Sequence, residues 1–169
     1  GGAGMAIAVS LVASTLVLTG CVGTALNIES RGEIAIPTAL RSQMRDKRMR
    51  AADPVLIRIF KQESELEVWK RDRAGQYALL KTYPMCRWSG QLGPKKAEGD
   101  RQAPEGFYYV TSDRMNPNSR FHLSFNLGYP NKYDRARGRT GSYLMVHGSN
   151  VSIGCFAMTD PQIEEIYTL

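Results

Sequence analysis

The stretch VHGSNVSIGCFAM, residues 146–158, brings a histidine and a cysteine close together in the sequence. His147 and Cys155 are eight residues apart, and Gly148 and Gly154 lie beside them. The apolar run 143–146 predicts a strand that ends at the histidine, and glycine permits turns and close backbone approach. Three interpretations follow from the spacing: a catalytic pair, part of a metal site, or a buried thiol on a glycine turn.

The catalytic interpretation requires a base beside the cysteine. A cysteine attacks as a thiolate, so its pKa must be lowered or a base must take its proton. His147 is placed to act as that base, Gly148 lets the chain turn after it, and the N–H groups of Gly154 and Cys155 are suited to hold an oxyanion. These parts fit acyl transfer. A buried structural cysteine accounts for the same spacing equally well.

The metal interpretation has fewer supporting residues. Zinc needs three or four ligands, and the chain has two histidines and no CxxC or HExxH pattern. A zinc site would need His122, His147 and Cys155 to converge, so we expect no metal. We expect Cys86 to be a buried thiol, and a disulfide between Cys86 and Cys155 is the alternative.

The first residues predict export. The run from Met5 to Gly20 carries no charge and has the length of a signal-peptide core rather than of a membrane span. LTGC, residues 18–21, resembles a bacterial lipobox, which implies a lipid on Cys21; an ordinary signal peptide or a plain anchor is the alternative. We therefore expect a periplasmic protein attached to a membrane, and no nucleic-acid partner. The formal net charge of +6 then favours an anionic lipid or wall polymer.

The rest of the chain predicts a mainly β domain with flanking helices. We expect a signal region at 1–21, a tether with a basic helix at 22–52 and a catalytic domain at 53–169 that is truncated at its C-terminus. Two long polar loops are expected at 89–106 and 128–141, with solvated basic residues around them. A helix is expected after Thr159, which has a capping-box partner in Gln162. The expected strands are 55–60, 66–69, 77–83, 107–110, 121–125 and 143–146.

Four longer stretches carry a family resemblance. They are IRIFKQESELEVWK, YPMCRWSGQLGPKKAEGDRQAPEGFY, MNPNSRFHLSFNLGYPN and GSYLMVHGSNVSIGCFAMTD. Together they resemble the YkuD-type L,D-transpeptidase catalytic domain, and within it the YafK-like branch, over residues 54–169. The resemblance implies a curved β-sandwich-like fold that needs no cofactor and acts on peptidoglycan stem peptides.

The resemblance also implies roles for the residues of the opening stretch. Cys155 would attack a carbonyl at an L-centre and form a thioester, and His147 would activate it. The backbone carbonyl of Gly148 would orient the histidine ring, and Gly154 and Cys155 would hold the oxyanion. An amine or water would accept the acyl group. Ile153 and Ala157 replace polar residues of the broader family, as in the YafK-like branch, which resembles enzymes that release a peptidoglycan-linked lipoprotein.

The substrate contacts are less closely defined by the pattern. Stem peptides bear carboxylates, which suit an arginine fork, so Arg101 or Arg139 is expected to reach the pocket. Ser152 and His122 are further candidates, with turn geometry and packing as their alternative roles. A lipid-anchored protein that binds peptidoglycan without chemistry remains the alternative to an enzyme.

Overall fold

The structure, a computed structural model, describes residues 33–150 and 154–169. The predictions for Cys21 and Ser152 concern residues outside these ranges. Among the helices that the structure describes, none is both long and apolar enough to cross a membrane.

A three-stranded antiparallel sheet forms the first layer, with strand order β1-β2-β3. Its strands are β1 (Val55–Phe60), β2 (Glu65–Arg71) and β3 (Tyr77–Pro84). The side chains of β2 alternate, so that Leu66, Val68 and Lys70 are buried, as expected for a strand with one covered face. The strands predicted at 55–60, 66–69 and 77–83 are confirmed.

A five-stranded sheet forms the second layer, with strand order β4-β8-β7-β6-β5. The central pair, β7 and β8, is parallel, and the other pairs are antiparallel. The strands are β4 (Arg87–Trp88), β5 (Met115–Asn116), β6 (Ser124–Asn126), β7 (Met145–His147) and β8 (Phe156–Ala157).

One apolar core joins the two sheets. Val68 of β2 belongs to the same buried cluster as Phe125, Val146 and Phe156 of the second sheet. The helix α3 (Asp160–Thr168) adds Ile163 and Ile166 to this cluster. Its expected capping box is present, because Thr159 accepts from the backbone of Gln162 and the Gln162 side chain accepts in return. The predicted class, mainly β with flanking helices, is confirmed.

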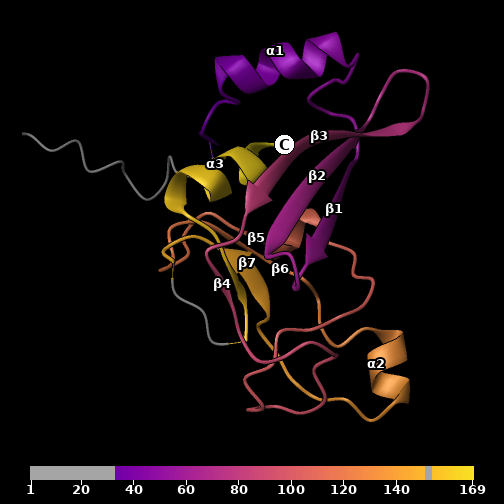
Figure 1. Cartoon of the computed structure of the whole chain (residues 1–169), viewed down its shortest axis with the longest axis vertical. Helices are drawn as coiled ribbons and strands as arrows, with labels where there is room; N and C mark the ends of the chain where they lie inside the picture. Colours follow the sequence, from indigo (N-terminus) through magenta and orange to yellow (C-terminus); the bar gives the residue numbers. More distant parts are fainter. Residues whose placement is uncertain (1–32, 151–153) are drawn as a thin grey trace, which may run out of the picture.

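The two remaining helices lie at opposite ends of the molecule (Figure 1). The basic helix α1 (Thr38–Asp46) buries Leu40 and Met44 in a small cluster with Leu80 of β3. The basic residues of α1 are exposed to solvent. The helix α2 (Lys132–Ala136) lies at the other end and is closed by a capping box between Asn131 and Asp134.

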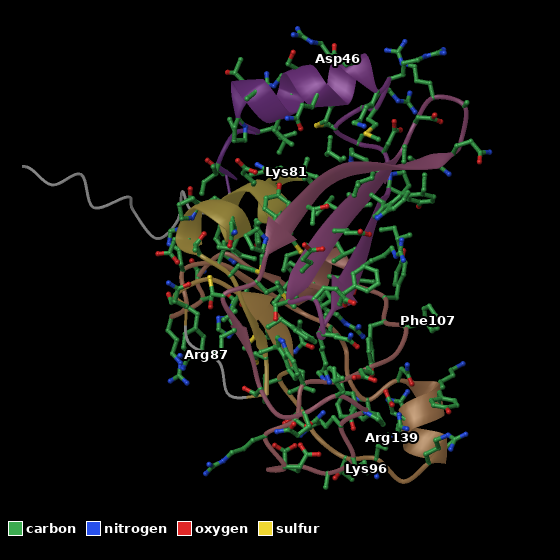
Figure 2. The ribbon with its side chains drawn as sticks, viewed as in Figure 1. Asp46, Lys81, Arg87, Lys96, Phe107 and Arg139 are labelled. Atoms are coloured by element: carbon green, nitrogen blue, oxygen red, sulfur yellow. The ribbon has the colours of Figure 1, made fainter. Side chains whose placement is uncertain are left out.

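Four predictions about secondary structure were wrong in detail, one of them the strand expected at 143–146, which is β7 at 145–147 and includes His147. Residues 107–110 form no strand, and Phe107 points away from the body of the molecule (Figure 2) with 97% of its surface exposed. The loop at 128–141 contains α2, since its capping box stabilises a short helix within a polar segment. The strand expected at 121–125 is β6 at 124–126, because His122 adopts a positive φ of 74° and interrupts the extended chain before it.

Candidate active site on the second sheet

The strand register gathers polar side chains on one face of the second sheet. His147 pairs with Ser124 of β6 on one side and with Ala157 of β8 on the other. Paired residues point to the same face, and successive residues alternate. The opposite face therefore carries Phe125, Val146 and Phe156, which belong to the core.

A second row of side chains lies next to the histidine row on the same face. Asn126 pairs with Met145, and Cys155, one residue before β8, continues the parallel register beside Met145. A hydrogen bond from the Met145 backbone to the Cys155 thiol agrees with this placement. We call this side of the sheet the site face; it comprises Ser124, His147 and Ala157 in one row and Asn126, Met145 and Cys155 in the next. His147 and Cys155 thus lie diagonally across adjacent strands.

His147 is held in one orientation. Its ring is stacked on Phe121 with 4.7 Å between centroids, and its Nδ1 lies 2.6 Å from the carbonyl oxygen of Gly148. A carbonyl oxygen only accepts, so Nδ1 carries the hydrogen and Nε2 keeps a lone pair in the neutral ring. Burial lowers the pKa of His147 below its ordinary value of 6.5, against a smaller opposite effect of the Gly148 hydrogen bond. The ring is therefore a neutral base at pH 7.

The turn after His147 is fastened to the start of α3. A side chain at Gly148 would meet Asp160 Oδ1 at 2.6 Å and the Phe121 carbonyl oxygen at 2.9 Å. The Ser149 N–H donates to the same Asp160 oxygen at 2.8 Å. The expectation that Gly148 makes the turn is wrong: Ser149 and Asn150 take the positive φ values, and Gly148 is needed for close packing.

Cys155 is buried, with 6% of its surface exposed. Its Sγ lies 3.7 Å from the carbonyl oxygen of Tyr143. Burial raises the pKa of Cys155 above its ordinary value of 9.0, while the hydrogen bond from Met145 and the charge of Lys95 act in the opposite direction. The group is therefore a protonated thiol at neutral pH, and its reaction requires a base. Gly154 precedes it with φ of 78°, a conformation that favours glycine.

Lys95 is the basic residue whose charge reaches Cys155, and the expectation that it is solvated was wrong. It is 3% exposed, and its Nζ donates to Ala97 O at 2.8 Å and to Asp100 Oδ1 at 2.5 Å. The sequence offers no periodic pattern that separates Lys95 from its neighbour Lys96. Its own loop supplies the hydrogen-bond acceptors, and Gly141 of the second long loop packs against its side chain.

None of the other predicted substrate contacts belongs to the two rows of the site face. His122 Nε2 contacts Glu164 Oε1 of α3 at 2.7 Å. Arg139 lies beside α2 (Figure 2), where its Nη1 donates to the buried Asp134 at 2.8 Å. Arg101 is exposed in the loop before Gln102.

Cys86 differs from the sequence-based expectations. Cys86 and Cys155 both carry thiols, so the alternative of a disulfide between them is wrong for this structure. The expectation that Cys86 is buried is also wrong, since it is exposed. Its backbone N–H donates to Ala157 O at 3.0 Å, directly before β4, the edge strand of the second sheet. Across residues 33–150 and 154–169, no group of three or more histidine, cysteine and acidic residues is placed to hold a metal.

Two of the surface depressions are relevant to the site. The larger, of about 960 Å³, lies between β1 and the C-terminal residues and is lined by neither His147 nor Cys155. The smaller, of about 390 Å³, includes Asn126 of the site face and Tyr143, whose carbonyl contacts the Cys155 thiol. We take the smaller depression as part of the candidate site because one of its lining residues, Tyr143, contacts the Cys155 thiol.

Sequence reasoning missed the polar partners of this face. Ser124 and Asn126 flank the apolar Phe125, and that alternation was the available signal for a strand with one polar face. No pattern in the sequence indicated that Arg114 and Arg135 line the smaller depression.

These features define a class of protein. The chain belongs to the YkuD family, since the L,D-transpeptidase catalytic domain matches residues 54–169. It is 48% identical over 121 residues to the "Putative L,D-transpeptidase YafK" of Escherichia coli strain K12, and equally to the protein of that name from E. coli O157:H7. The match covers 72% of this chain and 49% of each relative. The chain therefore spans about half the length of the curated relatives it matches.

Solved structures confirm the fold. A point mutant of the helical cell shape determining protein Pgp2 from Campylobacter jejuni has a TM-score of 0.58 and 26% identity, covering 76% of this chain and 48% of that chain. A second structure of Pgp2 gives 0.55 and 22% identity, covering 76% and 50%. The family resemblance of the four sequence stretches is thus confirmed.

Proposed function

We propose that this chain is a cysteine acyl-transfer enzyme that modifies peptidoglycan stem peptides. Family membership supports the reaction class. The observation that carries the proposal is the placement of His147 at the end of β7 and of Cys155 directly before the neighbouring parallel strand β8, with the Nδ1 hydrogen of His147 engaged by Gly148. Nε2 is thereby left as the only ring atom able to accept a proton.

In the proposed first step, His147 Nε2 takes the thiol proton while Cys155 Sγ attacks the carbonyl carbon at an L-centre, such as that of diaminopimelate. The carbon–sulfur bond forms, and the carbonyl oxygen becomes an oxyanion beside the N–H groups of Gly154 and Cys155. The carbon–nitrogen bond then breaks, and the leaving amine takes the proton from His147. A thioester remains on Cys155.

In the second step an acceptor attacks the thioester. The acceptor is an amine of another stem peptide or a water molecule, and His147 takes its proton while the thiol leaves. Water as acceptor would make the enzyme a hydrolase that releases a peptidoglycan-linked lipoprotein. We place this reaction outside the cytoplasm, in the periplasm, with Cys21 as the site of a lipid anchor. The formal charge of +6 suits an anionic wall.

The test is acyl-enzyme trapping. The chain is incubated with purified muropeptides, quenched in acid and measured by intact mass, with Cys155→Ala and Cys86→Ala compared. We expect a thioester adduct on the wild type and on Cys86→Ala, and none on Cys155→Ala. The product masses separate a new cross-link from a released peptide. Muropeptide binding without an adduct on any variant would instead support a non-catalytic peptidoglycan-binding protein.

A further inference from the structure

The smaller depression contains two arginine side chains on the far side of the cysteine row from His147. Along the site face, the row of Ser124 and His147 is followed by the row of Asn126 and Cys155. The chain then continues from Asn126 into the wall of the depression. Its lining residues are Arg114, Asn126, Gly128, Tyr129, Pro130, Arg135, Ser142 and Tyr143.

Arg114 is fixed against the backbone in this wall. It ends the 3-10 helix η2 (Ser112–Arg114), and its Nη1 donates to Tyr109 O at 2.6 Å and to Leu127 O at 3.4 Å. A Cβ on Gly128 would lie 1.6 Å from that Nη1. Only glycine therefore leaves room for the guanidinium at this position, and Gly128 also has φ of 80°. The group is held in place without an acidic partner.

Arg135 is fixed in the same manner on α2. Its Nη1 donates to the carbonyl oxygen of Pro130, which also lines the depression. The neighbouring acid, Asp134, is 1% exposed and is bonded to Arg139 and Tyr108 instead.

The positive charge of this pair is left without a salt bridge. In the part of the chain that the structure describes, neither Arg114 nor Arg135 takes part in an ion pair. Asp113, next to Arg114, hydrogen-bonds Thr111. The charge of Arg114 lowers the pKa of Asp113, but the two side chains form no ion pair. Each guanidinium has five N–H donors, and the backbone carbonyls engage Nη1 alone. Donors therefore remain for a ligand.

The depression is joined to the cysteine through the backbone. The Leu127 carbonyl that accepts from Arg114 belongs to the residue whose N–H donates to Leu144 O at 2.9 Å. Tyr143, the residue before Leu144, lines the depression and accepts from the Cys155 thiol. A ligand bound by the arginines would therefore lie on the far side of Tyr143 from the Cys155 sulfur, with that one residue between them.

We infer that Arg114 and Arg135 form a binding site for a carboxylate of the substrate peptide, next to the carbonyl that Cys155 attacks. A guanidinium presents paired donors that match a carboxylate. Backbone contacts that hold both groups reduce the entropy lost when the ligand binds. This inference rests on the proposed function for the identity of the ligand as a peptide. It assigns the recognised group to residues that the sequence analysis did not single out.

The experiment measures binding without turnover. In the Cys155→Ala background, calorimetry compares a synthetic stem tetrapeptide having free carboxylates with the same peptide amidated at each carboxylate. Arg114→Gln and Arg135→Gln are tested separately, because the exposed Arg135 can be changed without loss of a buried contact. Arg137→Gln is the matched control: it removes the same charge from the same region, but Arg137 stacks on Tyr133 and does not line the depression.

We expect Arg114→Gln and Arg135→Gln each to weaken binding of the acid peptide about tenfold or more, since a hydrogen bond to a charged group is lost. Binding of the amidated peptide and the Arg137→Gln affinities should change less than about twofold. Equal losses for both peptides, or no loss in Arg135→Gln, would overturn the inference. Acyl-enzyme trapping on the chain with Cys155 intact reports on the proposed function separately, so the two failures are distinguishable.

Discussion

Ser124 and His147 occupy directly paired positions of β6 and β7, and the Ser124 hydroxyl faces the same side of the sheet as the histidine. Within the described ranges, Ser124 Oγ is the buried side-chain atom that lacks a hydrogen-bond partner. A buried hydroxyl without a partner is unfavourable. Its position beside the candidate base therefore has a cost to stability in the resting protein.

Replacing this hydroxyl should not destabilise the fold. We expect Ser124→Ala to leave the free energy of unfolding unchanged or to raise it by up to about 1 kcal/mol, because no hydrogen bond is lost and an unsatisfied group is removed. Urea denaturation followed by circular dichroism measures the change. A loss of more than about 1 kcal/mol would show that the hydroxyl has a partner in solution.

Burial of His147 makes stability depend on pH in a defined window. Its pKa in the folded protein is lowered below 6.5, so between that lowered value and 6.5 the unfolded chain binds more protons than the folded one. The free energy of unfolding should then fall as pH decreases below 6.5, with no contribution from this group above it. Urea titrations at several pH values should show a smaller decrease in His147→Gln. An identical decrease in both proteins would contradict the burial of a neutral ring.

Gly148 should tolerate no side chain. In Gly148→Ala the new methyl group would approach Asp160 Oδ1 to 2.6 Å and Phe121 O to 2.9 Å, so the turn after His147 must shift. We expect a loss of about 1–3 kcal/mol in stability together with a reduced rate of acyl-enzyme formation. The comparison variant is Gly75→Ala, where no atom lies within 4 Å and positive φ is the sole obstacle. Wild-type acylation in Gly148→Ala would exclude a role for this turn in placing the base.

Lys61 should hold the long loop at 89–106 in place. Its side chain is 4% exposed, and its Nζ donates to Gly93 O at 2.8 Å and Ala103 O at 2.6 Å while pairing with Glu105 at 3.1 Å. Lys61→Met leaves these acceptors without a donor, and we expect a loss of about 2–4 kcal/mol. Limited proteolysis should also cut the loop faster.

A matched change on a more exposed lysine provides the control for Lys61. Lys81 pairs with Glu165, and its side chain is 37% exposed. Lys81→Met should therefore cost less than about 1 kcal/mol. If the free energy of unfolding falls by the same amount in both variants, the buried contacts of Lys61 do not stabilise the loop.

Local patterns predicted most of the regular structure. The run at 55–60 and the alternation from Leu66 to Trp69 identified the first sheet, because these strands pair with sequence neighbours. The Thr159 capping box identified the start of α3 for the same reason: its hydrogen bonds join residues three apart. The prediction of a strand from Phe107 to Val110 was wrong. Its aromatic side chains have strand propensity, but no neighbouring strand pairs with this segment.

The sequence by itself determined the three strands of the first sheet, the helix after Thr159 and the candidate residues His147 and Cys155. The tertiary structure alone decided which side chains share a face with them, because β7 pairs with β6 and β8 through contacts distant in sequence. It alone placed Arg114 and Arg135 in one depression and buried Lys95 near the thiol. Burial and strand register depend on contacts between residues distant in the sequence, so neither can be predicted from the residue type at one position.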